Sequence, residues 1–303
     1  MKKRNFYFIP LGIFLIGIII GSFLDLNINK SLYFPGNAYG MGFAAFGPWI
    51  GYAFLVFTCG FIFRFAIKEK NIYAKIGMFI LAIVGYGVSA YLSAGEVTSI
   101  NAFDCEDWKW LWIIIAVIVF SGCFYLGNIY GRKTEDKRIL FAFLILLLFF
   151  VIDLVPLAQI LKNVMRRPRY RVIAEGLFEN KAIFMNWWQP YKAYGAMFEK
   201  FGTTPSFSEQ FKSFPSGHTS VAGILIFGLP YLSLIEPKLK NKEGLLFGIG
   251  LGFTILMAFS RMTMGAHYLT DVSFGGLIMT VCSIFANEIN LKFFIKETEE
   301  IQG

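Results

Sequence analysis

The chain of 303 residues contains only two histidines, and both stand in short polar motifs beside apolar runs. One histidine can attack phosphorus as a nucleophile, and a second can give a proton to the leaving group. Arginine and lysine side chains nearby would bind the phosphate oxygens. The two motifs are Pro215-Ser216-Gly217-His218 and Ser260-Arg261-x5-His267-x3-Asp271.

The second motif gives its histidine a carboxylate partner. A step of four residues places His267 and Asp271 on one face of a helix, so Asp271 can hold the imidazole. A carboxylate bonded to one ring nitrogen fixes the tautomer and leaves the other nitrogen free to attack. Arg261 adds a planar guanidinium that suits phosphate oxygens. The alternative is a buried histidine that only bonds a neighbouring helix, but a match at four specified positions favours catalysis.

The first motif opens an apolar helix, and a helix start presents free backbone N–H groups that attract phosphate. Ser216 can cap this helix or donate to the phosphate, and Gly217 lets the backbone approach a ligand closely. His218 then stands at the rim, where it can protonate a departing alkoxide. The alternative is a plain helix cap followed by an exposed histidine.

A third cluster is basic and runs from Lys162 to Arg171. Pro168 interrupts the helix that Lys162 ends, so the cations fold back over the helix end. We expect Lys162 and Arg169 to bind phosphate together with the two histidine motifs. Taken without those motifs, the cluster would be assigned to lipid headgroups at a membrane surface.

The composition predicts the elements that position these residues. Hydrophobic residues make up 56% of the chain, charged residues make up 16%, and the mean hydropathy is +0.59, which excludes an ordinary soluble domain. A membrane-spanning helix needs about 20 apolar residues. We therefore predict an all-α, polytopic membrane helix bundle with about eight transmembrane helices, at 6–23, 42–63, 73–93, 110–130, 139–161, 217–235, 245–264 and 268–287.

The charge distribution predicts the orientation of the bundle. The N-terminus and the connections 64–75, 131–138 and 236–243 carry Lys and Arg, as cytoplasmic segments do. Counting spans from a cytoplasmic N-terminus places Lys162, His218 and His267 on the same outer face. The outer segment 162–216 is also basic, against this trend, which indicates an anionic partner such as phosphate. Its aromatic residues fit either a lid on the helix ends or an entrance for a lipid tail.

The three motifs, in this order, resemble the signatures of the type-2 phosphatidic acid phosphatase (lipid phosphate phosphatase) superfamily, which is related in site architecture to glucose-6-phosphatase and vanadium haloperoxidases. The two histidine motifs match fully. Lys162 and Arg169 have the spacing of the family's K-x6-R-P, but Tyr170 replaces the proline. A register that uses Arg167 and Pro168 keeps the Arg-Pro pair and loses the spacing. We favour Arg169, because the run K-x4-R-P-R resembles members with arginine at both positions.

The resemblance implies a mechanism and a set of site residues. It implies that His267 is the nucleophile that forms a phosphohistidine, that Asp271 orients it, and that His218 is the general acid. It also implies that no divalent metal and no other cofactor take part. The residues that it assigns to the phosphate oxygens are Lys162, Arg169, Ser216, Gly217 and Arg261.

The resemblance further implies a six-helix phosphatase core within residues 73–303, including an outer catalytic loop at 162–216. Residues 1–72 then form two extra N-terminal transmembrane helices. The partners that we expect are a lipid phosphate substrate and the lipid bilayer, and we expect no nucleic acid. The sequence leaves the oligomeric state open.

The function that we expect is hydrolysis of a lipid phosphate or diphosphate at the outer face of a bacterial cytoplasmic membrane. Polyprenyl diphosphate, phosphatidylglycerol phosphate and phosphatidic acid are all candidate substrates. One alternative is a membrane phosphotransferase or a phosphatase for a soluble phosphate ester. A second is a non-catalytic protein that binds or transports lipid phosphates, although binding needs cations and not an oriented neutral imidazole.

Overall fold

The computed structural model describes residues 5–100, 103, 105–134, 136–177, 183–189 and 205–302. Within these residues the chain is helical, and eight segments are long and apolar enough to cross a membrane. The predicted all-α bundle of eight spans is therefore confirmed. The main helices are α1 (Asn5–Leu32), α2 (Ala38–Lys68), α3 (Ile72–Thr98), α4 (Lys109–Lys133), α5 (Lys137–Ile152), α6 (Ala158–Met165), α7 (Tyr170–Ala174), α9 (Pro205–Gln210), α10 (Gly217–Tyr231), α11 (Glu243–Thr263) and α12 (Leu269–Gln302).

The fifth span is made of two helices in line. A π-helical turn, Asp153–Leu157, joins α5 to α6 and contains Pro156. Proline has no N–H to donate and crowds the preceding turn, which accounts for the local loss of α-helical hydrogen bonding. The turn carries the fully buried Asp153, whose carboxylate oxygens make no hydrogen bond within the described part of the chain.

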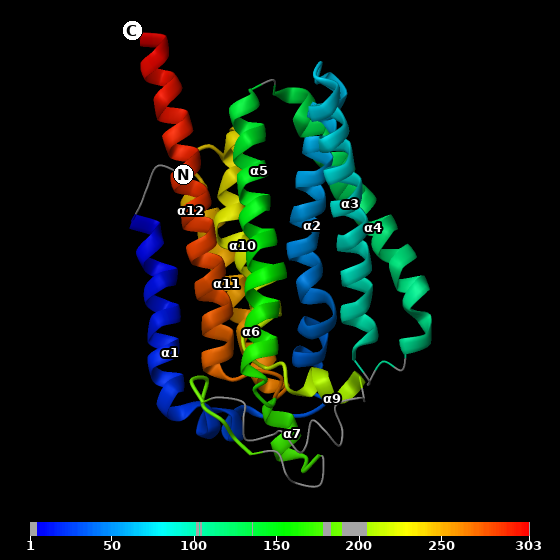
Figure 1. Cartoon of the computed structure of the whole chain (residues 1–303), viewed down its shortest axis with the longest axis vertical. Coiled ribbons are helices and arrows are strands. Elements are labelled where there is room, and N and C mark those ends of the chain that lie inside the picture. The colour runs from blue at the N-terminus through cyan, green and yellow to red at the C-terminus, as the bar shows by residue number, and fades with distance from the viewer. Residues whose placement is uncertain are drawn as a thin grey trace.

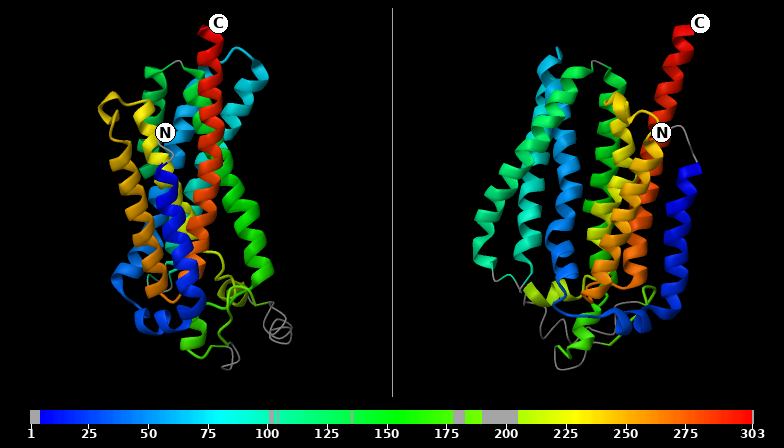
Figure 2. Two further views of the ribbon diagram at one scale, coloured as in Figure 1. Left: turned by 90° about the vertical axis from the view of Figure 1, so that its left-hand side faces the viewer. Right: turned by 180° about the vertical axis from the view of Figure 1, so that it is seen from behind.

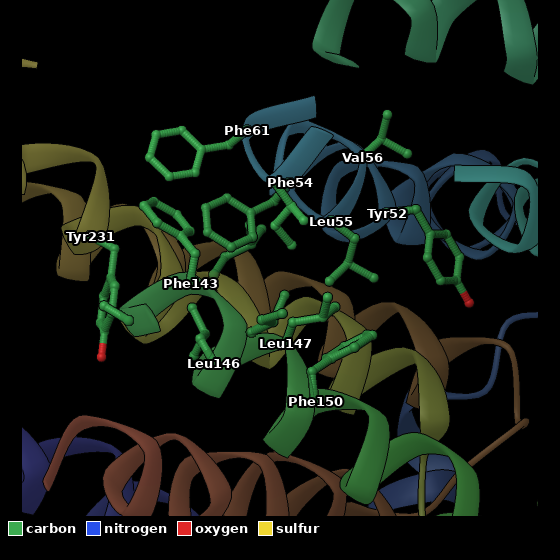
Figure 3. Close-up of a cluster of buried hydrophobic side chains, with 14 of the residues drawn as sticks. Tyr52, Phe54, Leu55, Val56, Phe61, Phe143, Leu146, Leu147, Phe150 and Tyr231 are labelled. Atoms are coloured by element: carbon green, nitrogen blue, oxygen red, sulfur yellow. The ribbon is translucent and has the colours of Figure 1, made fainter. Parts of the chain in front are cut away.

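Helix α2 lies inside the bundle and packs against α3, α4, α10 and α11 (Figure 1). Helix α1 packs along α12 at the other side, as the two further views show (Figure 2). The core between α2 and α5 is aromatic and aliphatic (Figure 3). Many apolar side chains of α1, α3 and α4 are exposed on the outside, as expected for helices that face lipid.

The two ends of the bundle differ. Both termini lie at one end, and α7, α9 and the turn between α11 and α12 lie at the other (Figure 1). The start of α10, the end of α6 and the start of α12 share this second end. The three sequence motifs are thus brought to the same end of the bundle.

The division at residue 72 stays a prediction, because the fold does not separate the first two helices from the rest. Helix α1 contacts α11 and α12, and α2 contacts α5, α10 and α11. Both helices also send groups to the site described next. Part of the predicted outer loop, residues 178–182 and 190–204, lies outside the described residues.

Candidate active site

Backbone hydrogen bonds tie the three motif segments together. Helix α6 ends at Met165 because Arg166 takes a left-handed conformation (φ 43°), after which the chain turns back across the bundle. Gly265 turns the chain between α11 and α12 with φ 59°, and a Cβ there would lie 2.8 Å from the Tyr33 ring. The connecting bonds are Arg169 N to Gln210 O (2.9 Å), Ser213 N to Arg167 O (3.1 Å), Arg171 N to Gly265 O (3.0 Å) and Ser216 N to Asp271 O (3.0 Å).

His267 is buried in the turn before α12, and a backbone carbonyl orients its ring. Its Nδ1 lies 2.5 Å from the carbonyl oxygen of Ser213 and 4.0 Å from Oδ2 of Asp271. Because a carbonyl oxygen only accepts, Nδ1 carries the hydrogen and Nε2 keeps its lone pair. The four-residue step does bring Asp271 beside His267, but the hydrogen bond that fixes the ring is made to Ser213.

Asp271 stabilises the backbone around His267 through two hydrogen bonds. Its Oδ2 accepts hydrogen bonds from Ser213 Oγ (2.5 Å) and from the backbone N–H of Tyr268 (2.9 Å). These bonds hold the residue whose carbonyl orients His267 and the residue that follows His267. Asp271 therefore fixes the loop on both sides of the imidazole.

The surroundings of His267 favour the neutral imidazole. Burial lowers the pKa of His267 well below its ordinary value, and the neighbouring cations Arg169 and Arg261 lower that pKa further. A neutral ring with a free Nε2 is the form that can attack phosphorus.

Arg167 belongs to a buried ion-pair network and not to the open site. Its side chain is 2% exposed, and it donates to Asp271 Oδ1 (2.6 Å), Asp25 Oδ2 (2.9 Å) and Thr270 Oγ1 (2.7 Å). The guanidinium also stacks on the Tyr268 ring, 4.1 Å from its centroid. Arg167 therefore joins α1 to α12 and neutralises Asp271.

Arg169, in contrast to Arg167, lies at the cavity. Its Nε donates to the backbone oxygen of Glu209 (2.9 Å), and its side chain lines the main cavity. The two candidate registers of the first motif are thus separated in space: the pair Lys162 and Arg169 faces the cavity, whereas Arg167 lies behind it. This placement supports the register with the family spacing.

His218 lies in the first turn of α10 and has an acidic partner. Its Nε2 is 3.1 Å from Oε2 of Glu96 on α3 and 3.1 Å from the carbonyl oxygen of Ala44 on α2. Both partners are acceptors, so they favour a protonated Nε2. Glu96 and Ala44 come from helices that the family motifs do not include.

One cavity of about 990 Å³ opens at the candidate residues. Arg261 is 5% exposed, and its Nε and Nη1 atoms have no hydrogen-bond partner among the described residues. Gly217 lets Lys162 approach the start of α10, since a Cβ on Gly217 would lie 3.2 Å from Lys162 Nζ. Buried donors without acceptors, beside a helix N-terminus, suit an anion. The candidate residues that line the cavity are Lys162, Arg169, Gly217, His218, Arg261 and His267.

Two candidate residues, Ser216 and Asp271, do not line the cavity. Ser216 is fully buried and caps α10, because its Oγ accepts from the N–H and the hydroxyl of Thr219 (3.4 and 3.0 Å). This is the capping role that the sequence allowed for it. Asp271 contacts Arg167 and Ser213, as described above. A phosphate contact by Ser216 stays a prediction.

Residues 143–294 match the family model of the PAP2 superfamily. The chain belongs to this superfamily. The curated proteins and the solved structures give no match. Membership in the PAP2 superfamily, together with the eight apolar helices, supports a phosphatase embedded in a membrane.

The sequence motifs did not reveal three further residues of the site. Asp25 and Glu96 lie on α1 and α3, outside the matched part of this PAP2 chain, and Ser213 acts through its backbone oxygen. The only sequence signal for Asp25 and Glu96 is an acidic residue near the end of an apolar run. Such a residue in a membrane protein is costly and often functional.

Proposed function

We propose that this PAP2 protein hydrolyses a lipid phosphate or diphosphate through a phosphohistidine intermediate. The observation that carries the proposal is the contrast between the two histidines that face one cavity. Nδ1 of His267 is hydrogen-bonded to the neutral backbone carbonyl of Ser213, whereas Nε2 of His218 lies 3.1 Å from the carboxylate of Glu96. A neutral partner for one imidazole and an anionic partner for the other favour different roles, a nucleophile and an acid.

In the first half-reaction, Nε2 of His267 attacks phosphorus. The N–P bond forms and the bond from phosphorus to the ester oxygen breaks. His218 gives a proton to that oxygen, so the leaving group departs as an alcohol. For a diphosphate, the leaving group is the lipid monophosphate. The Ser213 carbonyl stabilises the positive charge that develops on the His267 ring.

In the second half-reaction, water attacks the phosphohistidine and its proton passes to the now neutral His218. The N–P bond breaks, inorganic phosphate leaves, and both histidines return to their starting forms. Through both steps Arg261, Lys162, Arg169 and the N-terminus of α10 neutralise the charge on the phosphoryl oxygens.

A lipid substrate is supported by the position of the site. The cavity begins at the polar end of the bundle and continues between apolar stretches of α2, α3 and α5. A phosphate at the mouth of this cavity would leave a hydrocarbon chain at the depth of the membrane core.

The same proposal places the site at the outer face of the cytoplasmic membrane. The site lies at the end of the bundle opposite both termini, and the connections at the terminal end are rich in Lys and Arg. A reporter fused after Gly303 should therefore be cytoplasmic. A C-terminal reporter that is active outside the cytoplasmic membrane would overturn this orientation.

The activity can be tested with detergent-purified protein in EDTA. Phosphate release is measured from lipid phosphates, lipid diphosphates and glucose 6-phosphate, beside the variants His267→Ala and Lys240→Ala. Lys240 lies in a turn at the terminal end, so its replacement should change nothing. Release by the wild type and by Lys240→Ala, but not by His267→Ala, is the expected result.

Other outcomes would assign other functions. A folded wild type that releases phosphate only when an alcohol acceptor is added would be a phosphotransferase. Preference for glucose 6-phosphate would identify a soluble ester as the substrate. Binding of lipid phosphates without any turnover would leave a binding or transport protein. Loss of activity in EDTA that returns with a divalent cation would contradict the metal-independent mechanism.

A further inference from the structure

The cavity that contains the two histidines is much longer than a phosphate group needs. Its volume of about 990 Å³ lies at the upper end of ligand pockets, which span roughly 300–1,000 Å³. Beyond the cations its lining becomes apolar and passes along α2, α3 and α5. Cys59, Gly85 and Leu147 line its far end.

The apolar part is about as deep as one leaflet of a bilayer. On α3 the lining runs from Glu96 to Gly85, eleven residues apart, which corresponds to about 16 Å of helix. The hydrocarbon core of a bilayer is about 30 Å thick, so one leaflet contributes about 15 Å. A chain attached to a phosphate at His267 would therefore reach the middle of the membrane at the deep end.

This groove has a closed back and an open side. The back is formed by α2, where Leu55 and Cys59 are buried. The side is lined by residues that also face outward: Val88 is 49% exposed and Val155 is 61% exposed. Since these side chains would face lipid, a hydrocarbon chain can enter from the bilayer without crossing water.

The deep end is closed by contact between helices. A Cβ added to Gly85 would lie 2.7 Å from Cys59 Sγ, so α3 meets α2 directly there. Cys59 itself is fully buried. A chain longer than the groove therefore cannot continue straight along α2.

We propose that the groove between α2, α3 and α5 binds one hydrocarbon chain of the substrate, and that its closed end at Cys59 and Gly85 favours chains of about one leaflet in length. The polar end of the ligand rests on the proposed phosphatase site. A second chain, or the remainder of a long prenyl chain, stays in the bilayer beside Val88 and Val155. Helices α2 and α3 lie outside the matched residues 143–294, so the contact between Cys59 and Gly85 that closes the groove belongs to the N-terminal half of the chain.

The first test blocks the groove half-way. Val88→Trp places an indole in the lining, and Val84→Trp is the matched control, because Val84 is one turn away on α3, 55% exposed and outside the lining. Hydrolysis of hexadecyl phosphate is compared with that of hexyl phosphate in mixed micelles. Val88→Trp should lower kcat/KM for hexadecyl phosphate at least about tenfold and leave hexyl phosphate nearly unchanged. Val84→Trp should change neither.

The second test does not depend on turnover. A hexadecylphosphonate with a diazirine at the end of its chain is photolysed in the wild-type protein, and the adducts are mapped by mass spectrometry. Adducts in the peptides that contain Cys59, Gly85 or Leu147 are the expected result. If these adducts form while no alkyl phosphate is hydrolysed, the groove stands and the proposed phosphatase activity fails. If phosphate is released but adducts map elsewhere, or if Val88→Trp affects both chain lengths equally, the groove proposal is overturned.

Discussion

The imidazole of His267 is oriented by the carbonyl oxygen of Ser213, which lies 2.5 Å from Nδ1. Asp271, four residues further along the chain, acts on the ring indirectly, because its Oδ2 accepts a hydrogen bond from the hydroxyl of the same Ser213. The proposed nucleophile is thus oriented by the backbone of a loop that a carboxylate holds in place. In this relay the Ser213 carbonyl orients the ring directly, whereas Asp271 acts only through the Ser213 hydroxyl.

Replacing Ser213 by alanine should slow the reaction without abolishing it. The variant keeps the carbonyl that orients His267 and loses only the hydroxyl that donates to Asp271. A lost hydrogen bond to a charged group costs about 1.5–3 kcal/mol, so kcat should fall roughly 10- to 100-fold if that energy positions the ring. Phosphate release and thermal unfolding of Ser213→Ala are measured together. An unchanged kcat in a correctly folded variant would contradict the relay.

Glu96→Gln should selectively impair His218, the proposed general acid. The glutamine keeps the size of the side chain but removes the negative charge that favours protonated His218. An alkyl leaving group needs that proton, whereas p-nitrophenolate leaves without it. The variant should therefore lose about tenfold or more in kcat with an alkyl phosphate and much less with p-nitrophenyl phosphate. Equal losses with both substrates would indicate a purely structural role for Glu96.

The acid limb of the pH–rate profile should reflect protonation of the His267 ring. In the proposed mechanism the neutral ring is the reactive form, and burial with the nearby cations lowers the pKa of His267 below its ordinary value near 6.5. Activity should therefore persist as the pH falls below about 6.5. Arg169→Gln removes one of these cations, so the pKa of His267 and the acid limb should both move up. An acid limb that does not move in this variant would show that another group controls it.

Arg167 and Arg169 should differ in what their loss damages. Removing Arg167 leaves Asp25 and Asp271 buried without their cation, which costs about 3–5 kcal/mol of folding stability. Removing Arg169 takes a cation from the cavity and leaves those ion pairs intact. Arg167→Ala should therefore unfold at clearly lower temperature, and Arg169→Ala should stay folded with weaker inhibition by vanadate. If Arg167→Ala instead stays folded with weaker inhibition by vanadate and Arg169→Ala unfolds at lower temperature, Arg167 would be the residue that binds phosphate.

The sequence by itself determined the span count and identified the candidate catalytic side chains. Eight apolar runs must become helices, because backbone groups in lipid can only be satisfied within such segments. The spacing of His267 and Asp271 is local, and so is the position of His218 at a helix start. Short-range patterns of this kind do not depend on how the helices pack.

The tertiary structure decided the partners of these residues. Glu96 reaches His218 from α3, and Asp25 reaches Arg167 from α1, across 122 and 142 positions of sequence. No local pattern encodes which helix faces which. The placement of Arg167 and Arg169 was decided in the same way, since the chain turns at Arg166, which has a left-handed conformation, and Arg167 then lies at the buried carboxylates while Arg169 lines the cavity. Contacts between helices are set by packing, and packing is a property of the whole bundle.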